Sequence, residues 1–189
     1  LAAVLVMGWM AGDLFAKRMG WLAGAALLTS PGFFIGARVA GMDVLLLFCI
    51  AMTLVSFFQG YRSFSRRRPW FLLSGLFAGV GALAKGPLGF FIPAVVVLIF
   101  LLVRGELRIL LSRAALEACL VALLTASVWY APVWIRHPER FLRVFWLGNN
   151  LARLSEPVSD HSGPPVYYIP IFLFAFLPWS FPFGVALFR

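Results

Sequence analysis

Lys85 is a charged residue between two apolar stretches, and this position limits the roles that its ammonium group can have. It lies in "ALAKGPLGFFIP", between two apolar runs, and is followed directly by Gly86 and Pro87. Because proline lacks the N–H donor that a helix interior requires, this Gly-Pro pair predicts a tight turn that fixes the lysine at one depth. A lysine in that position suits the phosphate of a lipid. The alternative is a lysine that only extends its ammonium group from a membrane interface into water.

A second group of polar residues lies in the stretch of about 136–165. Arg153 follows Asn149 by four residues and Asn150 by three, so the three side chains can share one helical face. A guanidinium with amide neighbours is well suited to binding phosphate. The segment "ERFLRVFWLGNNLARL" also has the spacing of an amphipathic helix. The alternative is therefore a helix that simply lies on the membrane surface.

Asp43 and His161 each have a structural and a functional interpretation. Asp43 lies in "ARVAGMDVLLLF", where it is either the N-terminal cap of a helix or a site residue, with Arg38 as a candidate partner. His161 is either solvated or a ligand. One histidine does not make a metal site, because three or four protein ligands are usual. Tyr167 and Tyr168 are typical of aromatic residues at a membrane interface, and their alternative role is packing against a sugar or a prenyl chain.

The elements that must position these residues are transmembrane helices. Of the 189 residues 62% are hydrophobic and 12% charged, with a mean hydropathy of +0.95. This composition excludes a soluble globular domain and a disordered chain, and runs such as "FFIPAVVVLIFLLV" lack the alternation of a membrane β-barrel. We expect an all-α polytopic bundle of about seven spans. Their expected ranges are Leu1–Phe15, Gly20–Gly36, Val44–Phe58, Trp70–Leu83, Leu88–Val103, Ala114–Ile135 and Val166–Phe188.

The chain is expected to be an internal fragment of a longer membrane protein. It begins at Leu1 inside an apolar run, with no initiator methionine, and ends after another apolar run at Arg189. Residues 1–189 are therefore predicted to be one transmembrane domain, without its first span and without its C-terminal part.

The distribution of basic residues predicts which loops face the cytoplasm. The net charge is +9, and the strongest short basic cluster is "RSFSRRRP" at Arg62–Pro69. Basic loops lie on the cytoplasmic side of membrane proteins, so this loop is predicted to be internal. Lys85, Asp43 and the loop of about 136–165 then face outward. The charge indicates basic loops and anionic lipids rather than nucleic acid, and no nucleotide-binding or soluble-enzyme motif is present.

The order of several motifs resembles that of the bacterial GT-C membrane glycosyltransferases. The motifs are "ARVAGMD", "LAKGPLGFFIP", "WYAPVW", "NNLAR", "DHSGPPVYYIP" and a final "PW", from about Ser30 to Trp179. The sequence is most similar to the aminoarabinose transferases that modify lipid A and to the protein-mannosyltransferase-like family. The resemblance implies an inverting transfer of a sugar from a polyprenyl-phosphate carrier, on the external face of the bacterial inner membrane. The implied acceptor is lipid A, another glycan or a protein.

The resemblance also implies roles for individual residues. Lys85 and Arg153 would hold the carrier phosphate, Asp43 would belong to the active-site cavity, and His161 would contact a metal or the substrate. Asn149 departs from the pattern, since many relatives carry an acidic residue there. The cofactor is not identified, and a divalent metal is the candidate. The main catalytic carboxylates of the family lie in its first external loop, which we expect to precede Leu1.

A transporter or a lipid flippase is the alternative function. It would explain the spans and the prolines within them, but transporters place their sites near the membrane midplane. Here the polar residues gather on one predicted side. A lipid-linked-sugar transferase of another lineage, such as an O-antigen-ligase-like enzyme, is a further alternative.

Overall fold

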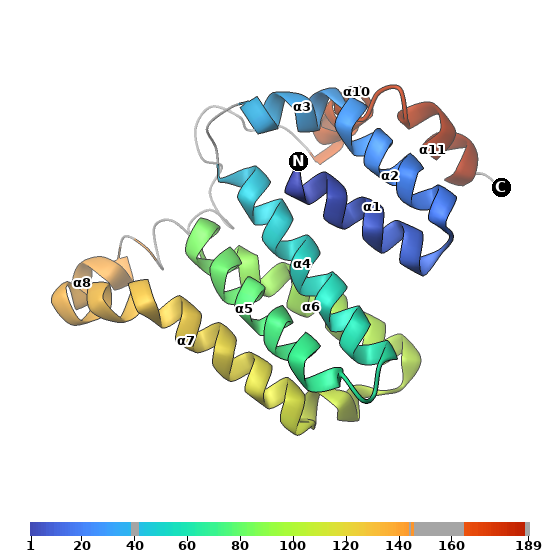
Figure 1. Ribbon diagram of the computed structural model, residues 1–189. Coiled ribbons are helices and arrows are strands. Elements are labelled where there is room, and N and C mark those ends of the chain that lie inside the picture. The colour runs from blue at the N-terminus through green and yellow to red at the C-terminus, as the bar shows by residue number, and fades with distance from the viewer. Residues whose placement is uncertain (39–41, 144, 146–164, 188–189) are drawn as a thin grey trace. The chain divides into compact units, whose positions relative to one another are not determined.

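The computed structural model describes residues 1–38, 42–143, 145 and 165–187, and these residues form helices and connecting turns without a strand (Figure 1). This confirms the predicted all-α fold. The chain divides into two compact units, one made of Leu1–Val44 with Pro157–Arg189 and the other of Leu45–Glu156. The prediction of a single transmembrane domain is not tested by this division.

The first unit begins with a helical hairpin. Helix α1 (Ala2–Leu14) packs against α2 (Lys17–Thr29) through glycines. A Cβ added to Gly20 would lie 2.6 Å from the carbonyl oxygen of Gly8, so the two backbones approach more closely than a side chain permits. Helix α3 (Pro31–Arg38) follows with a bend of 60° after Ser30, because proline cannot continue the hydrogen-bond ladder of α2.

The C-terminal part of this unit packs on α2 and α3. It consists of η3 (Pro165–Tyr167), α10 (Tyr168–Ala175) and α11 (Ser180–Leu187), with a bend of 113° between α10 and α11. The indole Nε1 of Trp179 donates a hydrogen bond to the hydroxyl of Thr29 at 2.7 Å. A Cβ on Gly32 would lie 2.7 Å from the Cβ of Ala175, so α3 and α10 are in close contact.

The second unit is built around α5. Its elements are α4 (Asp43–Arg62), α5 (Arg67–Lys85), α6 (Leu88–Arg104), η1 (Leu107–Leu111), α7 (Arg113–Arg136) and α8 (Pro138–Arg140). The first two residues of α4 belong to the first unit. Figure 1 shows α5 between α4 and α7. The hydroxyl of Ser74 on α5 donates to the carbonyl of Thr53 on α4 at 2.9 Å. On the other face, a Cβ on Gly79 would lie 2.7 Å from the carbonyl oxygen of Ala122 on α7.

Successive helices of this unit alternate in direction, so the connections gather at two ends. The α4–α5 and α6–α7 connections, which contain Arg66 and Arg108, lie at one end beside the buried cluster of Phe57, Phe71 and Leu101. The α5–α6 turn and the end of α7 at Arg136 lie at the other. This grouping agrees with the predicted separation of basic connections from the Lys85 turn. The side of the membrane that each end faces stays a prediction.

The helices coincide in position with the seven predicted spans, but they differ in length and straightness. Among the described residues only α4 and α7 are long and apolar enough to cross a membrane by themselves. If the bent pairs α2–α3 and α10–α11 each count as one span, the described residues contain up to four spans. Helix α1 has 13 residues, which corresponds to about 20 Å against the roughly 30 Å of a hydrocarbon core. The number of seven spans therefore stays a prediction.

Candidate functional site at the Lys85 turn

The predicted Gly-Pro turn at Lys85 is confirmed. Helix α5 ends at Lys85, Gly86 has a φ of 71° and a ψ of −156°, and Pro87 caps the start of α6. Glycine adopts this backbone conformation readily, whereas an L side chain would strain it. The N–H of Phe91 donates to the carbonyl of Pro87 at 2.8 Å, which closes the first turn of α6. The turn thus places the exposed side chain of Lys85 at the end of two packed helices.

Close helix contacts hold this turn in place. A Cβ added to Gly89 on α6 would overlap the carbonyl carbon of Gly81 on α5, so the two backbones touch about one turn from Lys85. A Cβ on Gly81 would also lie 3.2 Å from the Cβ of Cys49, which brings α4 into the same contact. Because α5 and α6 touch through their backbones and α4 packs against the same glycine, the backbone at Lys85 has little room to shift.

Tyr130 on α7 connects the Lys85 turn to the polar loop that follows. Its hydroxyl donates a hydrogen bond to the carbonyl oxygen of Ala82 at 2.6 Å, one turn before Lys85. Its ring contacts Phe141 and Phe145, with centroid distances of 5.9 and 5.2 Å. The chain that leads from α7 toward Asn149 and Arg153 is therefore anchored on the same tyrosine that contacts α5.

The hydrogen bond of Tyr130 was not predicted from the sequence, which suggested only an interfacial aromatic residue or packing against a sugar or prenyl chain. The sequence did indicate that its hydroxyl would need a partner. A tyrosine inside an apolar span needs a partner for its hydroxyl. The last carbonyls of a helix are acceptors without intrahelical partners. The aromatic residues Phe141 and Phe145 provide the apolar surface for its ring.

Asp43 is the first residue of α4 and is exposed. At this position its carboxylate lies at the positive end of the helix dipole, as the capping interpretation requires. The arrangement is equally compatible with a site residue at a helix terminus, so both interpretations of Asp43 stay open. The candidate partner Arg38 ends α3, and its guanidinium lies 4.4 Å from the ring centroid of Phe34.

The two tyrosines near the start of α10 are exposed. Tyr167 and Tyr168 have exposed fractions of 53% and 62%, and their rings meet edge to face with centroids 5.9 Å apart. They are thus available to pack against a sugar or a prenyl chain. Trp179 has in addition the internal hydrogen bond to Thr29.

Four of the predicted site residues, Asn149, Asn150, Arg153 and His161, lie outside the described residues. Within the described residues, no group of three or more His, Cys, Asp or Glu could hold a metal ion. The metal role of His161 is therefore not tested. What the structure provides is one exposed cation on a turn fixed by four helices, next to an aromatic cluster. A lysine whose backbone is fixed in this way can present its ammonium group to negative charge without a rearrangement of the backbone.

Comparison with known proteins gives consistent results along the chain. A family described as dolichyl-phosphate-mannose-protein mannosyltransferase matches residues 1–131. The undecaprenyl phosphate-alpha-4-amino-4-deoxy-L-arabinose arabinosyl transferase of Pseudomonas paraeruginosa is 35% identical over 144 residues, which is 75% of this chain and 26% of that protein. The protein of the same name from Aeromonas hydrophila is 30% identical over 140 residues, 73% of this chain and 25% of the relative.

A solved structure has the same fold. The crystal structure of ArnT from Cupriavidus metallidurans bound to undecaprenyl phosphate superposes with a TM-score of 0.83 and 26% identity. The match covers 97% of this chain and 34% of that one. The chain thus spans about a quarter of the length of these curated relatives and about a third of the solved protein.

Proposed function

The chain belongs to the dolichyl-phosphate-mannose-protein mannosyltransferase family, and we propose that it is part of a membrane glycosyltransferase that transfers a sugar from a polyprenyl-phosphate carrier. The match confirms the family resemblance found in the motifs. The acceptor that we propose is lipid A, another glycan or a protein. Support for the carrier comes from relatives whose names specify undecaprenyl phosphate and from a solved relative that binds it.

The observation that carries this proposal is the fixed position of Lys85. A sugar phosphate that breaks its bond to the anomeric carbon gathers negative charge on the departing phosphate. A cation held in place before the reaction stabilises that charge at no reorganisation cost. The backbone of Lys85 supports this role, because the Gly81–Gly89 contact and the Tyr130–Ala82 hydrogen bond fix the turn that bears the lysine.

The remaining predicted residues complete the reaction as follows. Arg153, with Asn149 and Asn150 beside it, binds the same phosphate through a planar guanidinium. Tyr167 and Tyr168 pack against the sugar or the prenyl chain. Asp43 is an accessory carboxylate, and the principal carboxylate comes from another part of the longer protein.

The transfer itself is a direct displacement. The acceptor oxygen forms a bond to the anomeric carbon while the bond from that carbon to the phosphate oxygen breaks, which inverts the configuration. The acceptor proton passes to a carboxylate acting as general base. The free polyprenyl phosphate leaves with the electron pair of the broken bond. His161 stays a candidate for contact with a divalent metal or with the substrate.

We place this reaction on the external face of a bacterial inner membrane. Support comes from the charge distribution, because the arginine-rich connections of the second unit lie at the end opposite to Lys85. Helices α4 and α7 are long and apolar enough to span a membrane.

The test uses the full-length protein in vesicles with defined polyprenyl-phosphate sugars and a lipid A or peptide acceptor. We expect glycosylated acceptor and free polyprenyl phosphate in equal amounts. Lys85→Ala should lose most activity, and Lys85→Arg should retain more of it. Lys17→Ala is the matched control, since Lys17 is also an exposed lysine at a helix terminus. Movement of a labelled lipid across the bilayer without any sugar transfer would replace this proposal by a flippase.

A further inference from the structure

The second unit contains an apolar cavity of about 310 Å3, whose lining on α6 extends from Phe90, near the Lys85 turn, to Leu98. Residues of α4, α5, α6 and α7 line it, and Ile109 and Leu110 of η1 line it at the end where the basic connections lie. Two hydroxyl groups line the cavity, and both already donate hydrogen bonds to backbone carbonyls. Thr53 donates to the carbonyl of Cys49 at 2.8 Å, and Ser74 donates to the carbonyl of Thr53 at 2.9 Å. The cavity therefore suits a hydrocarbon chain.

The cavity opens on the outer surface of this unit. Its exposed lining residues are Phe90 and Leu98 on α6, Leu110 on η1 and Cys119 on α7. The lining runs along α7 from Ala115 to Ala122. At 1.5 Å per residue this is about 10 Å of helix, long enough to accommodate part of an acyl chain.

Basic residues are close in sequence to the residues that line the cavity near η1. Arg108 directly precedes the lining residue Ile109, Arg113 lies two residues before Ala115, and Arg68 lies three residues before Phe71. Arg108 and Arg113 are exposed. The connections at this end, together with the helix ends that flank them, carry seven arginines and two glutamates: Arg62, Arg66, Arg67, Arg68, Arg104, Arg108 and Arg113, with Glu106 and Glu117.

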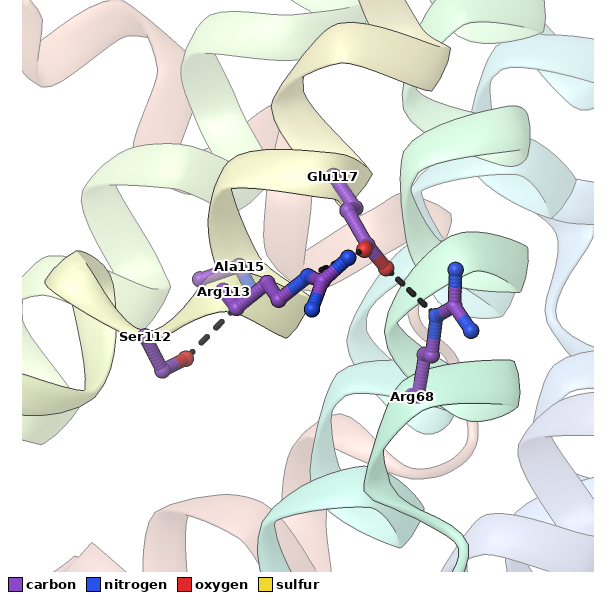
Figure 2. A network of polar contacts seen from close by, with 5 residues as sticks. All are labelled: Arg68, Ser112, Arg113, Ala115 and Glu117. Carbon is purple, nitrogen blue, oxygen red and sulfur yellow. Dashed lines mark hydrogen bonds and ion pairs between the residues drawn. The ribbon is translucent and has the colours of Figure 1, made fainter.

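One glutamate compensates part of this charge. Figure 2 shows Glu117 between two arginines, with Arg68 Nε at 2.6 Å from Oε2 and Arg113 Nε at 3.2 Å from Oε1. Arg113 is the first residue of α7, where the helix dipole favours an anion rather than a cation. A single carboxylate shared by two guanidiniums leaves a positive excess that a further anion would stabilise.

We propose that this cavity binds an acidic phospholipid, with one acyl chain between α6 and α7 and the phosphate head group at Arg108 and Arg113. The charge complementarity selects an acidic lipid over a zwitterionic one. Arg108 and Arg113 lie at the end of the unit opposite to Lys85, so the proposed lipid phosphate is separate from the phosphate of the sugar carrier and does not depend on the transfer activity.

Native mass spectrometry of the full-length protein in detergent provides the test. Phosphatidylglycerol and phosphatidylcholine with identical acyl chains are titrated separately, and the first phosphatidylglycerol should bind more tightly. Arg108→Gln and Arg113→Gln should each weaken it about fivefold, the effect of about one basic residue at an acidic lipid surface. Arg113→Gln leaves Glu117 paired with Arg68, so the variant should fold. Arg136→Gln, at the other end of α7, is the control and should leave binding unchanged.

A second pair of variants tests the cavity itself. Cys119→Phe places a ring in the opening and should abolish the tight binding. Leu120→Phe adds a similar ring at the next exposed position, which does not line the cavity, and should not. Equal affinity for the two lipids, or tight binding that survives Cys119→Phe and both arginine changes, would overturn the proposal. The proposal would also be overturned if polyprenyl phosphate competed with phosphatidylglycerol in a way that depends on Lys85. A structure of the longer protein with another helix inside the cavity would overturn it as well.

Discussion

The hydroxyl of Tyr130 donates a hydrogen bond to the carbonyl oxygen of Ala82 over 2.6 Å, across 48 residues of sequence. Ala82 is one of the last four residues of α5, whose carbonyl groups have no amide partner within the helix. The tyrosine thus satisfies an acceptor that the end of α5 leaves open, and it fixes α7 beside the turn that bears Lys85. Tyr130 is a positioning residue for the proposed site.

Tyr130→Phe removes this hydrogen bond and keeps the ring contacts with Phe141 and Phe145. Leaving a buried acceptor unsatisfied costs about 1–3 kcal/mol, so the unfolding temperature of the full-length protein should fall. A merely structural role would change stability alone. We expect in addition a weaker affinity for the polyprenyl-phosphate donor, measured by titration, because the Lys85 turn loses one support. The control is Tyr61→Phe, which removes a hydroxyl bound to Arg104 at the opposite end. If both variants bind donor equally well, Tyr130 does not position the site.

The contact between Gly81 and Gly89 leads to a second prediction, which concerns the stability of the packing between α5 and α6. Gly89→Ala places a methyl group on the backbone of α5, and α6 must move away. Overpacking of this kind costs about 1–3 kcal/mol and occasionally more. Thermal unfolding should show the loss, and sugar transfer should fall with it. Gly36→Ala is the control, since nothing lies within 4 Å of a Cβ there. That variant should be neutral or slightly stabilised by helix propensity. An unfolding temperature for Gly89→Ala that equals that of Gly36→Ala would contradict the close contact.

Much of this fold could be predicted from composition and local pattern. The all-α class follows from the apolar runs, and the turn after Lys85 follows from the Gly-Pro pair, because both depend on neighbouring residues alone. The bend after Ser30 was missed: residues 20–36 read as one apolar span, and hydropathy outweighed the single proline at position 31. The hydrogen bond between Tyr130 and Ala82 joins distant segments, and no local pattern encodes it. The roles of Asn149, Asn150, Arg153 and His161 came from motif order and stay predictions.

Asp43→Asn separates the two interpretations of that residue. Asparagine caps a helix about as well as aspartate, so expression, membrane insertion and unfolding temperature should remain near those of the original protein. If the carboxylate takes part in the site, turnover should fall while donor affinity changes little. Full activity of the variant would leave Asp43 with a capping role alone. Asp43→Ala gives the complementary result, since loss of the cap should cost about 0.5–2 kcal/mol.

The predicted sidedness can be measured with single cysteines in the full-length protein after replacement of its native cysteines, Cys49 and Cys119 among them, by alanine. Arg66→Cys lies in the arginine-rich connection and His161→Cys in the predicted external loop. An impermeant maleimide added to intact cells should label position 161 and spare position 66, and both should react after lysis. Labelling of position 66 in intact cells would reverse the topology and move the proposed site to the cytoplasmic side.

The last prediction concerns Lys85 and Arg153, which the proposal places on one phosphate although 68 residues separate them in sequence. Loss of one charge-assisted hydrogen bond costs about 1.5–3 kcal/mol, which corresponds to roughly a tenfold to more than a hundredfold loss in donor use. Lys85→Ala and Arg153→Ala should each show such a loss in donor affinity and turnover.

The double variant decides whether the two residues act together. If both cations bind the same phosphate oxygens, the combined loss should be smaller than the sum of the two single losses, because the second change removes a partner from a phosphate that is already poorly held. Lys17→Ala combined with Arg153→Ala is the matched control, and its effects should simply add. If the losses in donor use from Lys85→Ala and Arg153→Ala simply add, the two cations bind different chemical groups rather than one phosphate. Wild-type affinity and rate in both single variants would leave them as cations of the membrane interface, and the phosphate site would have to be sought elsewhere in the protein.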